Sequence, residues 1–197
     1  KTWWRASADS PWVALGEYGL TDARVVPVAF DGDGSLIVAS NQGRDLLALH
    51  RYDTAQKTLG ELIAAHPQVD LDGGLRFDPR KNAVVGLVYD GMKPGAAWFD
   101  DDWARTQDTI DKALPGRMNV LQGSEDGARV LVLSYSDTDP GTYYLFDRDR
   151  RRLEFVAATR KAIDPAAMPV REPVRYPARD GLVIPAYLTM PKGSAAG

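Results

Sequence analysis

A repeat with a period of 47 residues is the feature that most constrains how this chain can fold. Three sets of landmarks are related by this step: Phe30-Asp31, Phe77-Asp78 and Ser124-Glu125; Leu36–Val38, Ala83–Val85 and Val130–Val132; and Tyr52-Asp53, Phe99-Asp100 and Phe146-Asp147. The repeated segments are short apolar runs, and turn-forming residues separate them. Short strands that recur at such a period predict the blades of a β-propeller.

The predicted fold class is all-β, a partial propeller of about three and a half four-stranded blades. The N-terminal half-blade should hold two strands, Thr2–Ala6 and Trp12–Leu15. The strands of the three following blades are expected at Val25–Phe30, Leu36–Asn41, Leu46–Tyr52 and Leu59–Ala64; at Leu75–Asp78, Ala83–Tyr89 and Ala96–Phe99; and at Met118–Gln122, Ala128–Tyr135, Gly141–Phe146 and Leu153–Ala157.

The period also predicts which residues are equivalent. Val38, Val85 and Val132 should occupy the same place in the second strand of each blade. The aromatic landmarks of the third strands, Tyr52, Phe99 and Phe146, should be equivalent as well.

One helix is expected as an insertion over residues 100–114, where it replaces or follows the outer strand of a blade. Trp103, Ile110 and Leu114 fall on one helical face. The acidic run Asp100–Asp102 offers an N-cap and favourable charge at the positive end of the helix, and Pro115-Gly116 ends it. We therefore interpret the three carboxylates as a cap and not as a cation site.

The blade rhythm ends after Thr159. Lys161–Met168 has the composition of a linker with at most one helical turn. Two further strands, Val170–Tyr176 and Leu182–Met190, flank Arg179-Asp180-Gly181, and an Asp-Gly pair is a strong β-hairpin signal. This predicts two parts, residues 1–160 with the incomplete propeller and residues 161–197 with a linker and a C-terminal hairpin.

The segment Asp31–Ser35 has the alternating oxygen-bearing residues that open a calcium-binding loop. The sixth position of that loop needs a glycine and holds Leu36, and the twelfth needs a glutamate and holds Gln42. The equivalent segments one and two repeats later have ordinary turn composition. We predict a turn here and no metal site.

The remaining chemically suggestive residues also have structural interpretations. His50 lies in a strand repeat and His66 precedes Pro67, and neither is paired with a nucleophile. Trp3 and Trp4 are expected to pack within a blade. The arginines of Arg148–Arg152 alternate with an acid at a hairpin tip, so we predict a solvated turn and no nucleic-acid surface. No residue is assigned as catalytic, cofactor-binding or metal-ligating.

Composition limits the class of protein further. The chain of 197 residues has a net charge of −3, which gives no electrostatic footprint for nucleic acid. It lacks a run of about 18 apolar residues, so no membrane span is expected. The absence of cysteine is compatible with cytoplasm or periplasm. Because the chain opens Lys1-Thr2 without a Met or a signal core, we expect a segment of a longer protein.

The segment 170–193, VREPVRYPARDGLVIPAYLTMPKG, resembles the entry to the catalytic domain of prolyl oligopeptidase-family serine peptidases, which include dipeptidyl and acylaminoacyl peptidases. The matching residues are Tyr176, Arg179-Asp180-Gly181, Tyr187-Leu188 and Pro191. A preceding propeller is also typical of that family. The motif covers about two dozen residues, and the architecture covers the whole chain.

The resemblance implies an α/β-hydrolase domain with a Ser-Asp-His triad after the hairpin and a propeller that caps the active site and gates access of peptide substrates. We expect no cofactor. This chain ends before the family's His-Gly-Gly stretch and has no Gly-x-Ser-x-Gly elbow. The nearest string, Gly123–Gly127, lies in a repeated turn and lacks the spacing. We therefore expect the chain alone to be inactive, and no triad residue is transferred to it.

Two other interpretations compete with this one. A stand-alone propeller could bind a protein partner, and a propeller enzyme such as a lactonase could carry its own metal site. The Arg-Asp-Gly hairpin argues against the first, and the lack of acidic and Asn residues converging on a channel argues against the second. An incomplete ring should expose apolar blade faces, so we also expect self-association or packing of the hairpin on an open face.

Overall fold

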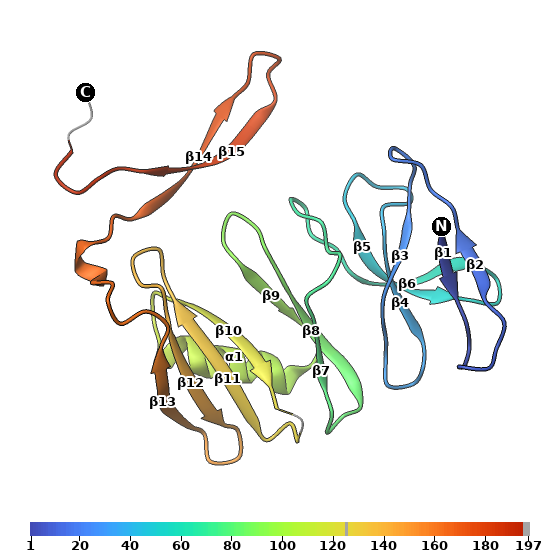
Figure 1. The fold of residues 1–197 in the computed structure, drawn as a ribbon, viewed down its shortest axis with the longest axis horizontal. Coiled ribbons are helices and arrows are strands. Elements are labelled where there is room, and N and C mark those ends of the chain that lie inside the picture. The colour runs from blue at the N-terminus through green and yellow to red at the C-terminus, as the bar shows by residue number, and fades with distance from the viewer. Residues whose placement is uncertain (125, 195–197) are drawn as a thin grey trace. The chain divides into compact units, whose positions relative to one another are not determined.

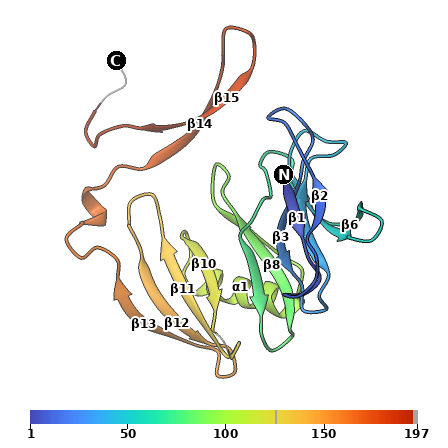
Figure 2. The ribbon, with the colours of Figure 1, turned by 45° about the vertical axis from the view of Figure 1, so that its right-hand side comes forward.

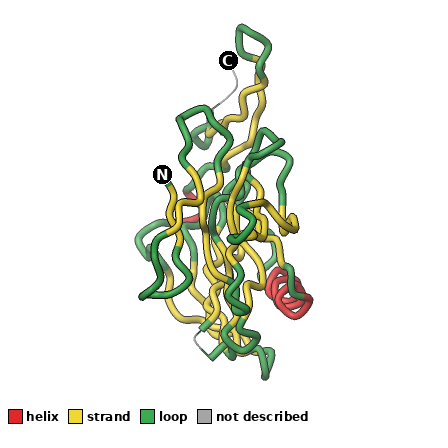
Figure 3. Tube along the Cα trace, turned by 90° about the vertical axis from the view of Figure 1, so that its right-hand side faces the viewer, coloured by secondary structure: helices red, strands yellow, loops and turns green. Residues whose placement is uncertain are grey.

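The computed structural model describes residues 1–124 and 126–194. The predictions that involve Glu125 or the last three residues lie outside the described part. The described residues form two compact units, Lys1–Gly91 with Gly95–Phe99, and Met92–Pro94 with Asp100–Gly197. Figure 3 shows that strands and loops make up most of the chain, with one long helix.

The first unit contains three antiparallel sheets whose strands follow one another in chain order (Figure 1). Their strands are β1 (Thr2–Trp4) and β2 (Val13–Gly16); β3 (Val25–Phe30), β4 (Leu36–Ser40), β5 (Ala48–Asp53) and β6 (Thr58–Ala64); and β7 (Leu75–Asp78), β8 (Ala83–Tyr89) and β9 (Gly95–Trp98). These are a half-blade, a complete blade and a blade that lacks its outer strand, as the repeat predicts.

The core of this unit lies on both faces of the β3–β6 sheet, and β4 is buried along its whole length. Leu36 and Val38 face one cluster, in which they meet Leu15, Val25 and Tyr52. Ile37 and Ala39 point the other way into a second cluster with Leu47, Leu49, Leu71 and Leu87. Because side chains alternate along a strand, a continuous apolar run supplies both cores at once.

The second unit contains the helix, one complete four-stranded sheet and the C-terminal hairpin. Its elements are α1 (Asp101–Ala113), β10 (Met118–Gly123), β11 (Arg129–Tyr135), β12 (Thr142–Asp147), β13 (Arg152–Ala158), the short helical turn η1 (Pro165–Ala167), β14 (Arg171–Pro177) and β15 (Val183–Thr189). Figure 2 shows the hairpin extending from the β10–β13 sheet by way of η1. No helix in the described ranges is long and apolar enough to cross a membrane.

Helix α1 follows β9 in the sequence, at the point where the repeat would place an outer strand, and it packs on β10. Asp100 is its N-cap, and the Asp100 carboxylate accepts hydrogen bonds from the N–H groups of Asp102 and Trp103. The buried face consists of Trp103, Thr106 and Ile110. The predicted cap is therefore confirmed, as is the burial of Trp103 and Ile110 on one face, whereas Leu114 lies at the C-cap and is only half-buried.

The predicted equivalence of the second strands is confirmed. Val38, Val85 and Val132 lie in β4, β8 and β11, and each is at most 2% exposed. The third strands agree in two of the three blades, because Leu36 pairs with Tyr52 just as Val130, two repeats later, pairs with Phe146.

The prediction for Phe99 is wrong. The repeat places Phe99 opposite Ala83, but the Phe99 N–H donates to the carbonyl of Val85, two residues further along β8. Phe99 is consequently 39% exposed, whereas Tyr52 and Phe146 are buried.

Close contact between Gly86 and Trp98 explains the shifted register. The two residues pair directly. A Cβ atom on Gly86 would lie 2.5 Å from Cε3 of Trp98 and 2.7 Å from the carbonyl oxygen of Ala97. The indole therefore occupies space that only a glycine leaves open, and this contact selects the pairing of β8 with β9.

We expect Gly86→Ala to lower the free energy of unfolding by about 1–3 kcal/mol, because the added methyl group meets backbone as well as ring atoms. Chemical denaturation measures this change. Gly73→Ala is the matched control, since nothing lies within 4 Å of its added Cβ and its φ lies outside the left-handed region. Equal effects of the two variants would contradict the proposed role of the Gly86–Trp98 contact.

Candidate functional site

The predicted turn between β3 and β4 is confirmed. The N–H of Asp31 donates to the carbonyl of Ser35, and the N–H of Gly34 donates to the carbonyl of Asp31. Within the described residues, no group of three or more His, Cys, Asp or Glu side chains is arranged to hold a metal ion. The chemistry of this turn is instead that of an ion-pair network centred on Arg51.

Arg51 projects from β5 toward three acidic side chains. Its Nη2 lies 2.9 Å from Oδ2 of Asp31, and longer contacts of 3.7 Å and 3.8 Å reach Asp33 and Glu61. The guanidinium also donates to the hydroxyl of Ser35. Only the Asp31 side chain is well buried, at 10% exposed, so the Asp31–Arg51 pair is the strong member of the network.

The Asp31 turn also joins two blades. Oδ1 of Asp31 accepts from the N–H of Val84 at 2.8 Å, and Nδ2 of Asn82 donates to the carbonyl of Gly32 at 2.9 Å. A Cβ atom on Gly32 would overlap the carbonyl oxygen of Asn82 at 1.4 Å. The turn therefore packs backbone to backbone on the β7–β8 turn, which is a structural role.

Two opposing effects act on the pKa of Asp31. Burial raises it, but the N–H donors of Val84 and Gly32 and the Arg51 guanidinium together outweigh burial, so the pKa lies below its ordinary value. Asp139 in the second unit behaves alike. Burial raises its pKa, whereas Arg117, at 2.7 Å, and the N–H of Gly141 lower it below the usual range.

The structure places His50 in a blade strand and His66 in a connection between blades. His50 lies in β5 opposite Val38 and is 9% exposed, and neither ring nitrogen has a hydrogen-bond partner within the described residues. Nδ1 of His66 accepts from the N–H of Gln68, and its ring centroid lies 4.8 Å from that of Tyr89. Neither environment supplies a serine for a histidine to activate.

The prediction of a fully solvated Arg148–Arg152 turn is wrong for Arg148. Its guanidinium lies 4.5 Å from the ring centroid of Trp103 and donates to the carbonyl of Gly127. The aromatic partner comes from α1, about one blade earlier in the sequence, so local spacing could not reveal it. This cation–π contact ties the helix to the β12–β13 turn.

The two N-terminal tryptophans have different environments. Trp4 packs against the core of the β3–β6 sheet, as predicted, whereas Trp3 is 51% exposed. Trp3 lines an apolar hollow together with Trp12, and the Arg5 guanidinium lies 4.5 Å from the Trp12 ring centroid. The outward face of β1–β2 is thus an exposed aromatic surface.

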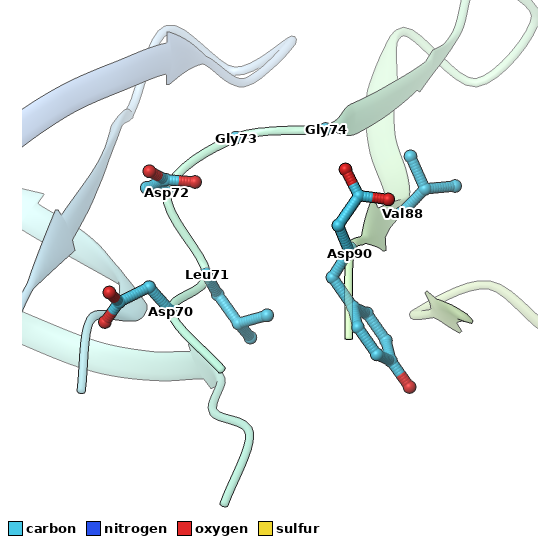
Figure 4. Close-up of a pocket in the computed structure, with 8 residues that line it drawn as sticks. Asp70, Leu71, Asp72, Gly73, Gly74, Val88 and Asp90 are labelled. Atoms are coloured by element: carbon cyan, nitrogen blue, oxygen red, sulfur yellow. The ribbon is translucent and has the colours of Figure 1, made fainter. Parts of the chain in front are cut away.

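A cavity of about 260 Å³ opens where the β6–β7 connection meets the end of β8 (Figure 4). Its lining residues are Asp70, Leu71, Asp72, Gly73, Gly74, Val88, Tyr89 and Asp90. Oδ1 of Asp70 accepts from the N–H of Leu47 at 2.6 Å, and Asp70, Asp72 and Asp90 are all exposed. This lining can attract a positively charged group, and its described residues include no serine, threonine or cysteine.

The C-terminal hairpin is fully paired, from Arg171 opposite Thr189 to Pro177 opposite Val183. The turn between the strands is closed by the Ala178 N–H, which donates to the carbonyl of Leu182 at 2.7 Å. Gly181 has a φ of 87°, which explains the need for glycine in the Asp-Gly pair. The hairpin predicted from the Arg179–Gly181 signal is therefore confirmed.

We expect Asp31→Asn to lower the free energy of unfolding at neutral pH by roughly 1–2 kcal/mol, because the neutral amide would lose the charged contact with Arg51. The depressed pKa means that the carboxylate adds stability above its ordinary pKa and loses it as pH falls through the lower folded value. The difference between wild type and variant should therefore shrink below about pH 4. Denaturant melts at several pH values measure it.

Asp33→Asn is the control for this prediction, because Asp33 faces the same arginine at 3.7 Å but is 66% exposed. It should have the smaller effect at neutral pH. A difference between wild type and Asp31→Asn that stays constant while the Asp31 carboxylate becomes protonated in acid would contradict the assigned role of the carboxylate.

Comparison with known proteins places this geometry in context. No protein-family model matches the chain. Dipeptidyl aminopeptidase BIII from Pseudoxanthomonas mexicana is 23% identical over 195 residues, which make up 98% of this chain and 28% of that protein.

Solved structures with similar folds include a prolyl endopeptidase, with a TM-score of 0.62 and 17% identity over 97% of this chain and 27% of that one. A puromycin hydrolase matches with a TM-score of 0.55 and 19% identity, over 92% of this chain and 28% of that one. The chain spans about a quarter of the length of the proteins it matches.

These matches confirm the predicted fold and the resemblance that the hairpin motif carries. Along nearly its whole length, this chain is similar to the propeller portion of prolyl oligopeptidase-family peptidases.

Proposed function

We propose that this chain is the substrate-gating propeller region of a serine peptidase that hydrolyses peptides or acylated or aminoacyl peptides. The observation that carries the proposal is the hairpin of β14 and β15, which follows the last blade after a short linker and contains the Arg179-Asp180-Gly181 signal. The 23% identity to a dipeptidyl aminopeptidase across 98% of the chain supports it.

The proposal includes a domain boundary near residue 160. Residues 1–160 form propeller blades, and residues 161–197 form a linker and the first hairpin of a hydrolase domain. Three features support this boundary: β13 ends at Ala158, η1 interrupts the strands, and β14 pairs only with β15 in its sheet.

Peptide hydrolysis needs an activated nucleophile, a base and donors for the oxyanion. Ser124, in the string nearest to an elbow motif, instead bonds through its hydroxyl to the Asp126 carboxylate and to the carbonyl of Arg129. His50 is enclosed in a blade core and His66 is held by Gln68 and Tyr89. We therefore propose that the nucleophile and base belong to the hydrolase domain that the hairpin begins.

Labelling with a fluorophosphonate tests this proposal. The 197-residue chain should remain unlabelled and should not hydrolyse peptidyl or aminoacyl amides, whereas the same propeller with its native downstream residues should do both. In that longer protein, removal of the propeller should change the size range of accepted peptides more than the rate of serine labelling. Labelling of the short chain at one defined serine, or no labelling of the longer protein, would refute it.

The exposed face of β1–β2 favours a second role in assembly, and we propose that the isolated chain self-associates through it. Trp3 and Trp12 are 51% and 59% exposed on this face, beside an apolar hollow. Apolar surface of this kind normally marks an interface.

We expect sedimentation velocity to show concentration-dependent association of the wild-type chain. Trp3→Ser with Trp12→Ser should weaken it by roughly tenfold or more, because two aromatic side chains leave the interface. Phe155→Ser, at a side chain that is 65% exposed on β13, is the control and should associate as wild type does. A compact monomer at all concentrations would rule out this mode of assembly.

A further inference from the structure

Arg171, at the base of the C-terminal hairpin, makes two different contacts at once. Its guanidinium lies 4.3 Å from the ring centroid of Tyr187 on the paired strand β15. Nη2 of the same side chain lies 3.6 Å from Oδ1 of Asp137. Since Pro173 pairs with Tyr187, Arg171 and Tyr187 are diagonal neighbours on one face of the hairpin.

Asp137 belongs to the loop between β11 and β12, which is well anchored. The N–H of Ser136 donates to the carbonyl of Asp139 at 3.0 Å, and Asp139 pairs with Arg117 at 2.7 Å. Arg117 in turn donates to the hydroxyl of Ser134 at the end of β11. Asp137 therefore offers a positioned carboxylate to Arg171.

Tyr187 reaches a second loop. Its hydroxyl donates to the carbonyl oxygen of Met92 at 2.5 Å. Met92 lies in the loop between β8 and β9 and belongs with residues 100–197 to the second compact unit. The hairpin is thus held at two loops that connect second to third strands in consecutive blades.

These polar contacts act where apolar packing is weak. No residue of β14 or β15 in the described hairpin is fully buried. Arg171 is 46% exposed and Asp137 is 26% exposed, so the ion pair is accessible to salt. An exposed ion pair, a surface cation–π contact and a single hydrogen bond each change an equilibrium by only about two- to tenfold.

We propose that Arg171 and Tyr187 form a clasp that holds the hairpin on the Asp137 and Met92 loops and opens reversibly. The clasp closes when both contacts form, and the hairpin then has one orientation. Salt weakens the Arg171–Asp137 pair, so raising the ionic strength shifts the equilibrium toward the open form. The inference concerns this chain alone and does not depend on the proposed peptidase activity.

Distance measurement between two spin labels tests the clasp in the full 197-residue chain. The sequence has no cysteine, so Ala113→Cys at the end of α1 and Arg179→Cys at the hairpin turn, both exposed, take the labels specifically. At low salt the background with only these labels should show one dominant distance. Asp137→Asn with Tyr187→Phe should increase the population at other distances by roughly fivefold or more, because two of the clasp contacts are lost.

The control pair lies on the same hairpin. Glu172→Gln removes one exposed charge, and Tyr176→Phe removes one exposed hydroxyl; neither group has a partner among the described residues. This pair should keep the dominant distance. Added salt should broaden the distance distribution of the protein that carries only the two labels. It should not further broaden the distance distribution of Asp137→Asn with Tyr187→Phe. A distribution that is the same in both double variants, whether narrow or broad, would overturn the proposal.

Discussion

Burial of β4 on both faces is the constraint on which the rest of this structure depends. All five residues from Leu36 to Ser40 are buried, with alternate side chains entering two separate clusters. A strand of this kind cannot lie at the surface, so the β3–β6 sheet needs a partner sheet on each side. The β1–β2 pair supplies one and the β7–β9 sheet supplies the other, which is why a single apolar run dictates a series of stacked blades.

The sequence is a good guide to the strands because their signals are local. Alternating apolar residues and turn residues mark each strand, and the period of 47 makes three weak signals support one another. Register between strands depends instead on which side chains meet. The Gly86–Trp98 contact shifts β9 and leaves Phe99 exposed, and the contact of Arg148 with Trp103 likewise joins residues that no local pattern relates.

Of the candidate site, the sequence predicts the turn at Asp31 and the helix cap at Asp100, because both follow from local residue patterns. Acidic residues that lie close together in a sequence can indicate a metal site. In this structure, three such carboxylates accept hydrogen bonds from backbone N–H groups. Asp31 accepts from Val84, Asp70 from Leu47 and Asp100 from Trp103. Turns and helix ends leave N–H groups unpaired, and a short carboxylate satisfies them at low conformational cost. Only three-dimensional pairing reveals that Asp31 and Asp70 link elements far apart in sequence.

The sequence of the C-terminal hairpin limits which of its surfaces can contact the rest of the protein. Pro173 and Pro177 in β14 and Pro185 in β15 occupy one set of alternating positions, where a missing N–H is tolerated only toward an open edge. Because these prolines have no N–H to donate, another strand cannot pair fully with either edge of the hairpin. The hairpin must therefore contact its neighbours mainly through its two faces.

One face of the hairpin carries Arg171 and Tyr187, which already contact two loops. The other carries Val174, Tyr176, Ile184, Ala186 and Leu188, and Tyr176 and Leu188 remain 51% and 45% exposed. Since an isolated two-stranded sheet is only marginally stable in water, this apolar face supports the proposal that the hairpin begins a further domain.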